Sequence, residues 1–293
     1  MADNPLVCAH HFNLRDAIIS AMAGGIAGIS IDFALFPVDS IKTRLQASSK
    51  KVDYTKEAKN VSKYRGFLSA MLASFPCAAV FWCSYEFSKY ELKKHTTGYI
   101  NINIQHMLAA ATGEICQALV RNPFEVVKQN LQVGKYKNML ECGIDIFKHK
   151  SIGGFYSGYL SFIMREIPFS SIQFPFYEML KLVQIKLIAF RTGQNENIVQ
   201  IPSLINGLNG SIAGSFSGFI VTPFDVAKTR LMTHNFKDKL PSTASVLKEV
   251  YHEEGVKGLY RGAGIRMMYL GVGGFAFFGI YEKIKQTLIN KFE

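Results

Sequence analysis

Apolar residues gather in six stretches of about 20 residues, each interrupted by glycine, serine or a charged side chain. They lie near residues 17–36, 67–85, 104–122, 157–178, 203–222 and 264–281. A helix of about 20 apolar residues crosses the hydrocarbon core of a bilayer, so the pattern predicts six membrane-spanning helices. Glycines recur at steps of four in the fifth stretch, at Gly210, Gly214 and Gly218. This spacing favours close packing of membrane helices over a soluble helix, which so many glycines would weaken.

Two short motifs recur three times along the chain, in the same order. The first has a proline, an acid two residues later and a base five residues later; its copies are Pro37-Val38-Asp39-Ser40-Ile41-Lys42, Pro123-Phe124-Glu125-Val126-Val127-Lys128 and Pro223-Phe224-Asp225-Val226-Ala227-Lys228. The second is Tyr-Glu-x-x-Lys, and it begins at Tyr85, Tyr177 and Tyr281. Copies of the first motif are 86 and 100 residues apart, which predicts three repeats of two spans each, over residues 1–100, 101–195 and 196–293.

The triplicated proline motif resembles the signature of the mitochondrial carrier family, and the resemblance covers the whole chain. It implies an all-α membrane fold with six transmembrane helices in three pseudo-threefold repeats. It also implies a central substrate cavity between two gates. The resemblance further implies a multi-pass protein of the mitochondrial inner membrane, with both termini toward the intermembrane space. We expect the chain to act as a monomer.

The proline motif has a physical reason to form a gate. Proline removes a backbone hydrogen bond and bends a helix, so three bent ends can meet around one axis. We expect the acids to pair with bases of neighbouring repeats and close the matrix side; this matrix gate comprises Asp39, Lys42, Glu125, Lys128, Asp225 and Lys228. The alternative is that each acid pairs with the base three residues later on its own helix, a contact worth about 0.2–0.5 kcal/mol. Recurrence beside proline favours the ring.

The second motif predicts a cytoplasmic gate at the other end of the cavity. Its charged members are Glu86, Lys89, Glu178, Lys181, Glu282 and Lys285, and the tyrosines that would hydrogen-bond to its ion pairs are Tyr85, Tyr177 and Tyr281. The family pattern also implies a glutamine nine residues after each proline, which braces an ion pair of the matrix gate. Gln46 and Gln132 occupy that position, whereas Met232 replaces the third glutamine.

Ionisable side chains inside membrane spans are costly and by default mark a transport pathway. Four lie well inside the predicted spans, and Arg121 and Arg266 lie nearer the span ends; the four are Asp32, Glu114, Arg165 and Glu166. Acids outnumber bases among these four, which suits a cationic substrate that also carries a carboxylate. For Glu114, neutralising Arg165 is as well supported as contact with a ligand.

Residues 106–133 and 164–181 are similar to the S-adenosylmethionine carriers of that family, as is Asp32 just ahead of the first proline motif. This resemblance implies that Arg165 binds the substrate carboxylate, while Asp32 and Glu166 receive the ammonium and the sulfonium. Phe81 is an expected neighbour of the adenine. S-adenosylhomocysteine would leave the matrix in exchange. The alternative function is that of a carrier of the same family that transports a nucleotide or an amino acid.

The chain has 33 basic and 22 acidic side chains, for a net charge of +11. These charges are spread along the chain without a nucleic-acid-binding motif, so we expect no nucleic-acid partner. Neither metal-ligand spacing nor a nucleophile with a base is evident, so we expect a transporter without a cofactor, not an enzyme. Residues 42–65, 128–150 and 228–261 hold 20 lysines and arginines, against six in 89–101 and 181–199. This bias places the three long loops in the matrix, where they would attract anionic lipid such as cardiolipin.

Overall fold

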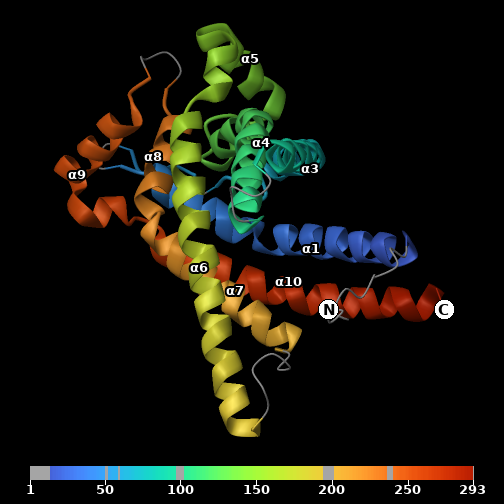
Figure 1. Ribbon diagram of the computed structural model, residues 1–293. Coiled ribbons are helices and arrows are strands. Elements are labelled where there is room, and N and C mark those ends of the chain that lie inside the picture. Colours follow the sequence, from blue (N-terminus) through green and yellow to red (C-terminus); the bar gives the residue numbers. More distant parts are fainter. Residues whose placement is uncertain are drawn as a thin grey trace.

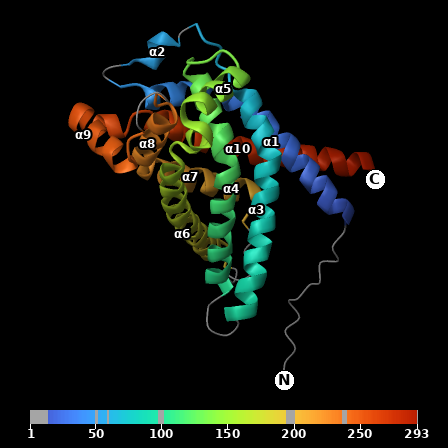
Figure 2. The same ribbon diagram turned by 90° about the horizontal axis from the view of Figure 1, so that it is seen from above.

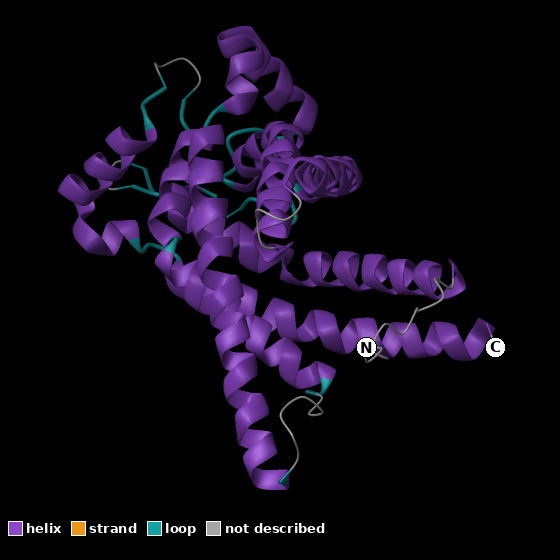
Figure 3. Ribbon diagram, in the orientation of Figure 1, coloured by secondary structure: helices purple, strands orange, loops and turns teal. Residues whose placement is uncertain are grey.

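The computed structural model describes residues 14–49, 52–58, 60–96, 102–193, 201–235 and 240–292. Within these ranges every regular element is a helix (Figure 3). The long helices that contain the apolar stretches are α1 (Leu14–Ala47), α3 (Phe67–Thr96), α4 (Ile102–Gln132), α6 (Tyr159–Thr192), α7 (Ser203–Ile220) and α10 (Ala263–Phe292). Shorter helices connect them, namely α2 (Tyr54–Glu57), α5 (Met139–Lys150), the 3-10 helix η1 (Ser151–Tyr156), α8 (Thr222–Met232) and α9 (Thr243–Leu259).

Helix length exceeds what a membrane crossing requires in five of the long helices. α1, α3, α4, α6 and α10 have 34, 30, 31, 34 and 30 residues. At 1.5 Å per residue, 30 residues span about 45 Å, more than the roughly 30 Å hydrocarbon core. Judged by length and composition alone, one helix of the described part of the chain, over Phe67–His95, is apolar enough to cross a membrane. The polar positions inside the other long helices lower their mean hydropathy.

The three motif prolines act differently on their helices. α1 continues through Pro37 and α4 continues through Pro123. In the third repeat α7 ends at Ile220, and α8 starts again at Thr222 with Pro223 in its first turn. Proline is tolerated in a first turn because its missing N–H has no partner there in any helix. In the third repeat the helix therefore ends and restarts before the proline, where a bend in one continuous helix was expected.

The long helices form arms that meet at one end and diverge at the other. α3 packs along α4, α6 packs along α7, and α10 contacts both α1 and α7. In Figure 1, α1 and α10 extend together to one side, while α6 and α7 extend downward. The meeting point lies where α8 joins the C-terminal parts of α1 and α4 (Figures 1 and 2). The motif prolines and their charged residues are therefore gathered at one end of the molecule.

Two small apolar cores lie at this meeting end. The larger joins α4, α5 and α6 through Val126, Cys142, Ile146 and Phe162. Burial raises the pKa of the Cys142 thiol to about 12, so the thiol stays protonated and packs as an apolar side chain. The smaller core joins α8 to α9 around Val226 and Val250. Short helices thus fasten the proline-motif ends from outside.

The outer surface of the arms is strongly apolar. Phe75 and Trp82 of α3 are 83% and 60% exposed, and Phe190 of α6 is 88% exposed. A soluble monomer rarely exposes contiguous apolar surface on this scale. The exposure indicates a surface that lipid covers.

Candidate functional site

Three ion pairs between residues of the proline motifs join the repeats at the end where the arms meet. The Lys128 ammonium lies 2.7 Å from an Asp39 carboxylate oxygen. The pair of Lys228 with Glu125 measures 3.4 Å, and that of Lys42 with Asp225 measures 3.6 Å. Each acid therefore contacts the base of a neighbouring repeat, in a closed cycle from α1 to α4, α8 and back to α1. We call these six residues the base ring.

Amide side chains support the base ring unevenly. Gln132 donates a hydrogen bond of 3.1 Å from its Nε2 to the Asp39 carboxylate, as expected of a brace. Gln46 accepts a hydrogen bond from the Thr229 hydroxyl, and its Nε2 has no hydrogen-bond partner among the described residues. Gln129, which the sequence analysis missed, donates to Glu125 at 2.9 Å. Its position one helical turn after Glu125 was the available signal.

Asp225 makes direct contact with three cations. Besides Lys42, it contacts Arg266 and accepts a 3.0 Å hydrogen bond from Nε of Arg165. Arg165 also pairs with the adjacent Glu166. The Asp225 and Arg266 side chains are 4% and 2% exposed, so this cluster is shielded from water. Arg165, expected at the substrate, is here bound to two carboxylates of the protein.

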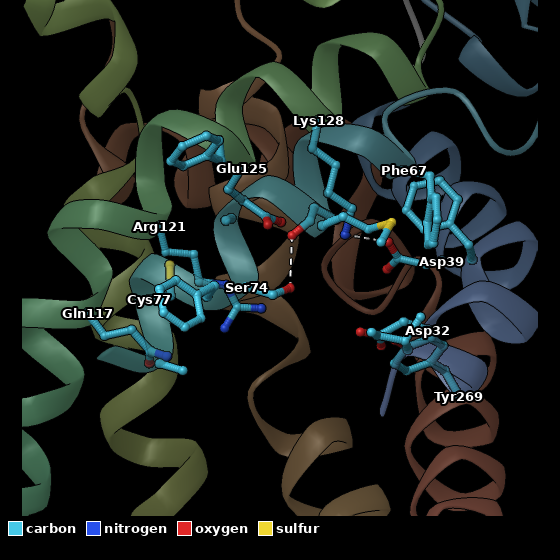
Figure 4. Close-up of a pocket in the computed structure, with 18 residues that line it drawn as sticks. Asp32, Asp39, Phe67, Ser74, Cys77, Gln117, Arg121, Glu125, Lys128 and Tyr269 are labelled. Atoms are coloured by element: carbon cyan, nitrogen blue, oxygen red, sulfur yellow. Dashed lines mark hydrogen bonds and ion pairs between the residues drawn. The ribbon is translucent and has the colours of Figure 1, made fainter. Parts of the chain in front are cut away.

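A charged cavity of about 450 Å³ lies directly against the base ring (Figure 4). Asp39, Glu125 and Lys128 of the base ring line it, together with Asp32 and Arg121. Of the five side chains expected to bind substrate, Asp32 is the one that lines this cavity. Gln117 of α4 and Tyr269 of α10, which the sequence analysis missed, also line it. Gln117, Arg121, Glu125 and Gln129 follow one another at four-residue steps, a polar stripe that was readable from the sequence.

A second cavity of about 670 Å³ adjoins the first and is lined by glycine-rich parts of α1, α7 and α10. We call it the glycine-lined cavity. Phe169, Tyr177 and Glu178 of α6 also line it. Asp32 and Tyr269 border both cavities and so lie at their junction.

Glu114 and Phe81 lie outside the lining of both cavities. Glu114 is partly buried on α4. The Phe81 ring packs where α3 approaches α4, and a Cβ added at Gly113 would lie 3.1 Å from it. Phe81 also stacks with Tyr85 at a ring-centroid distance of 6.1 Å and meets the edge of Trp82 at 5.6 Å. In this conformation Phe81 is part of the helix packing.

The two described ion pairs of the expected cytoplasmic gate are far more exposed than the base ring, and each lies within one repeat. Glu86 lies 3.5 Å from Lys89, and Glu178 lies 3.7 Å from Lys181; both pairs are within one helix. Lys89 also lies over the Tyr85 ring. The side chains of the third copy, Tyr281, Glu282 and Lys285, lie outside the described residues. The divergent arms in Figure 1 explain why the described pairs stay on their own helices.

Gly66 is fitted tightly against the base ring. Its φ of +94° is in a region that side chains rarely adopt, and an added Cβ would lie 2.9 Å from the backbone oxygen of Lys128. We expect Gly66→Ala to destabilise the protein by about 1–3 kcal/mol, seen as a lower Tm in detergent. Gly143→Ala is the matched control, since Gly143 lies inside α5 with nothing within 4 Å of the added Cβ. Equal Tm values for the two variants would contradict the close contact at Gly66.

The family profile described as mitochondrial carrier protein matches residues 15–96, 102–187 and 199–292. The chain belongs to the mitochondrial carrier family. This carrier is 39% identical to the mitochondrial S-adenosylmethionine carrier protein of Mus musculus, over 92% of this chain and 95% of that protein. It is 38% identical to the putative mitochondrial carrier protein PET8 of Saccharomyces cerevisiae, over 94% and 95% of the two chains. Its identity with S-adenosylmethionine carrier 1, chloroplastic/mitochondrial, of Arabidopsis thaliana is 35%, over 92% and 79%.

Proposed function

We propose that this carrier imports S-adenosylmethionine across the mitochondrial inner membrane into the matrix, in exchange for S-adenosylhomocysteine. The observation that carries the proposal is the charged cavity, in which Asp32 and Arg121 present opposite charges above a closed base ring. S-adenosylmethionine has a sulfonium and an ammonium for the acid and a carboxylate for the base. The similarity to S-adenosylmethionine carriers over most of the chain supports the same substrate.

Six helices crossing the membrane, with both termini toward the intermembrane space, complete the proposal. The base ring then lies on the matrix side, since the long basic loops follow it in each repeat. In the proposed orientation the closed base ring faces the matrix, and the charged cavity opens toward the intermembrane space. Anionic lipid such as cardiolipin would bind to the basic loops. A monomer suffices for transport in this proposal, because residues of one chain line the whole charged cavity.

Alternating access follows from the balance of charges in the base ring. Ion pairs in a low-dielectric site gain Coulomb energy and lose hydration, so their net contribution is small enough for a ligand to shift. Substrate bound in the charged cavity lies against Asp39, Glu125 and Lys128 and changes the field that they experience. When the base ring opens, the charged residues of the cytoplasmic gate form ion pairs between repeats in place of pairs within one helix. These residues are Glu86, Lys89, Glu178, Lys181, Glu282 and Lys285. The tyrosines Tyr85, Tyr177 and Tyr281 then hydrogen-bond to those pairs.

The test is uptake of labelled S-adenosylmethionine by liposomes that contain the purified full chain. We expect uptake to rise when S-adenosylhomocysteine is loaded inside. The substrate carries one net positive charge and the product none, so each exchange moves one charge inward, worth about 2.3 kcal/mol per 100 mV. A negative interior potential should therefore accelerate uptake.

Liposomes with the Asp225→Asn variant supply the transport-deficient control. A rate that does not respond to potential would overturn the proposed exchange. Exchange of a nucleotide or another amino acid, with S-adenosylmethionine inert, would overturn the substrate and leave the family fold in place.

A further inference from the structure

The Lys228 ammonium is buried with few hydrogen-bond acceptors around it. Its side chain is 7% exposed. An ammonium can donate three hydrogen bonds, but among the residues that the structure describes its one acceptor is Glu125, at 3.4 Å. The corresponding pair of Lys128 with Asp39 is much tighter, at 2.7 Å. A buried cation with unfilled hydrogen-bonding capacity costs free energy unless another group offsets the loss of water. A second stabilising neighbour is therefore expected.

The phenyl ring of Phe162 on α6 is that neighbour. The Lys228 ammonium lies over it, 4.0 Å from the ring centroid. The other cation–aromatic distances among the described residues are all 5.5 Å or more. The face of an aromatic ring attracts cations, and the attraction is strongest where water is excluded. Phe162 is itself 2% exposed, so water does not screen this contact.

Two further cations lie near the same phenyl ring. The guanidinium carbons of Arg121 and Arg165 are 5.8 Å and 5.9 Å from the Phe162 centroid. Like charges gathered at a site of low dielectric repel one another, and the negative faces of the ring between them offset part of that repulsion. Phe162 therefore lies where positive charge is concentrated, although the residue itself is apolar.

The contact crosses the boundary between the second and third repeats. α6 packs against α8, as Figure 1 shows, and Ser161 donates a 3.2 Å hydrogen bond to the backbone oxygen of Phe224. This hydrogen bond fixes the residue next to Phe162 against α8, which carries Lys228. The ion pair of Lys228 with Glu125 joins the same two repeats. Phe162 and Glu125 therefore contact one lysine from the same side of the boundary.

The third repeat also lacks the amide brace of the other two. Gln132 follows Lys128 by four residues and donates to the acid that Lys128 pairs with. The residue four positions after Lys228 is Met232, which cannot donate such a hydrogen bond. Met232 packs with Phe162 in the larger apolar core. An aromatic ring and a methionine thus occupy the place where a glutamine would support the ion pair.

We propose that Phe162 is a positioning residue of the matrix gate, whose ring binds the Lys228 ammonium through a cation–π contact in place of the missing glutamine brace. The contact stabilises the closed base ring, and α8 must leave Phe162 as well as Glu125 when the base ring opens. The contact itself is independent of the transported solute. Its role in opening rests on the proposed alternating access.

The test replaces Phe162 by a trifluorinated phenylalanine in the full chain. Fluorine is nearly as small as hydrogen and withdraws electron density from the ring face, so it weakens a cation–π contact with little change in packing. We expect the Tm in detergent to fall by about 2–6 °C, which corresponds to a loss of about 2- to 30-fold in the ratio of folded to unfolded protein. Rings with one and two fluorines should give smaller, graded losses.

Phe155 is the matched control, since it packs against the same apolar core and no cation of the described residues lies over its ring. Trifluorination there should leave the Tm unchanged or raise it slightly, because fluorine adds apolar surface to a buried contact. If Phe162 merely filled the core, the two positions would respond alike. Equal changes at the two positions would therefore overturn the proposal.

A background with Lys228→Met and Glu125→Gln tests the dependence on the lysine. It removes the ammonium and its carboxylate together, so neither partner is left buried and unpaired. Most of the effect of fluorination at Phe162 should disappear, and an undiminished effect would overturn the proposal. If this background does not fold, the comparison of Phe155 with Phe162 in the native base ring decides. Wild-type liposomes that exchange no S-adenosylmethionine would instead overturn the proposed function and leave the contact in place.

Discussion

We expect the Asp225→Asn variant to lose S-adenosylmethionine exchange and to have a markedly lower Tm than the wild-type protein. The Asp225 carboxylate lies among Lys42, Arg165 and Arg266 and is almost fully buried. A neutral amide would leave three cations close together without the carboxylate that all three contact. Removing one partner of a buried ion pair costs about 3–5 kcal/mol, because the remaining charge stays desolvated. This corresponds to a loss of about 10² to 10³-fold or more in the population of the closed base ring.

Asp53→Asn is the matched control for this substitution. Asp53 also pairs with a lysine, at 3.8 Å from Lys56, but on the protein surface, and its side chain caps α2. Asparagine preserves the cap and loses a solvated ion pair, so the Tm should be unchanged. Circular dichroism in detergent measures the melting of both variants, and liposome exchange measures their transport. An Asp225→Asn variant as stable and as active as Asp53→Asn would show that the three-cation cluster does not hold the base ring.

The second large effect concerns the pairing partner of Asp39. We expect each single variant, Asp39→Lys and Lys128→Asp, to lose exchange, because it places like charges against each other at the tight 2.7 Å contact. The double variant with both changes exchanges the two charges between α1 and α4 and should recover much of the exchange rate. Residues in direct contact couple by about 0.5–3 kcal/mol in such cycles, and a buried charge pair belongs at the upper end.

A second double variant, Asp39→Lys with Lys42→Asp, keeps the same composition and net charge but exchanges the charges within α1. The structure predicts that it stays inactive, since it sets lysine against Lys128 and aspartate against Asp225. If acids paired with the base three residues later on their own helix, this variant would be the active one and the inter-helix exchange would fail. Liposome exchange and Tm, measured on all four variants, decide between the two pairings.

The structure confirms that the six apolar stretches lie in helices, and a predominantly helical chain was expected. The break between α7 and α8 was not expected, because the motif around Pro223 has the same form as the motifs at Pro37 and Pro123, which their helices accommodate. Whether a helix bends or ends at a proline depends on the packing around it. In the third repeat α8 packs against α9 around Val226 and Val250.

The binding site was less readable than the fold. Asp32 was expected in the cavity because burying a carboxylate inside a membrane span costs free energy, so such a residue by default marks a transport pathway. Phe81 was expected for its aromatic ring, yet it fills the contact between α3 and α4 beside Gly113. Tyr269 gave no signal, since one aromatic residue in an apolar helix is most often packing. The direction in which each helix presents such a side chain decides its role, and that direction depends on helix rotation in the bundle.

By itself the sequence determined the repeat, the helices and the family, because these depend on local pattern: hydrophobic length, proline spacing and the order of charges. It also determined which charges form the base ring, since threefold recurrence leaves few ways to pair them. The tertiary structure alone decided which partner each remaining charge has. Arg165 and Arg121 are both arginines in or near a predicted span, and only their surroundings differ: two carboxylates hold the first, and a cavity faces the second. Electrostatic energy depends on distances between helices that are remote in sequence, so it becomes readable only once those helices are placed.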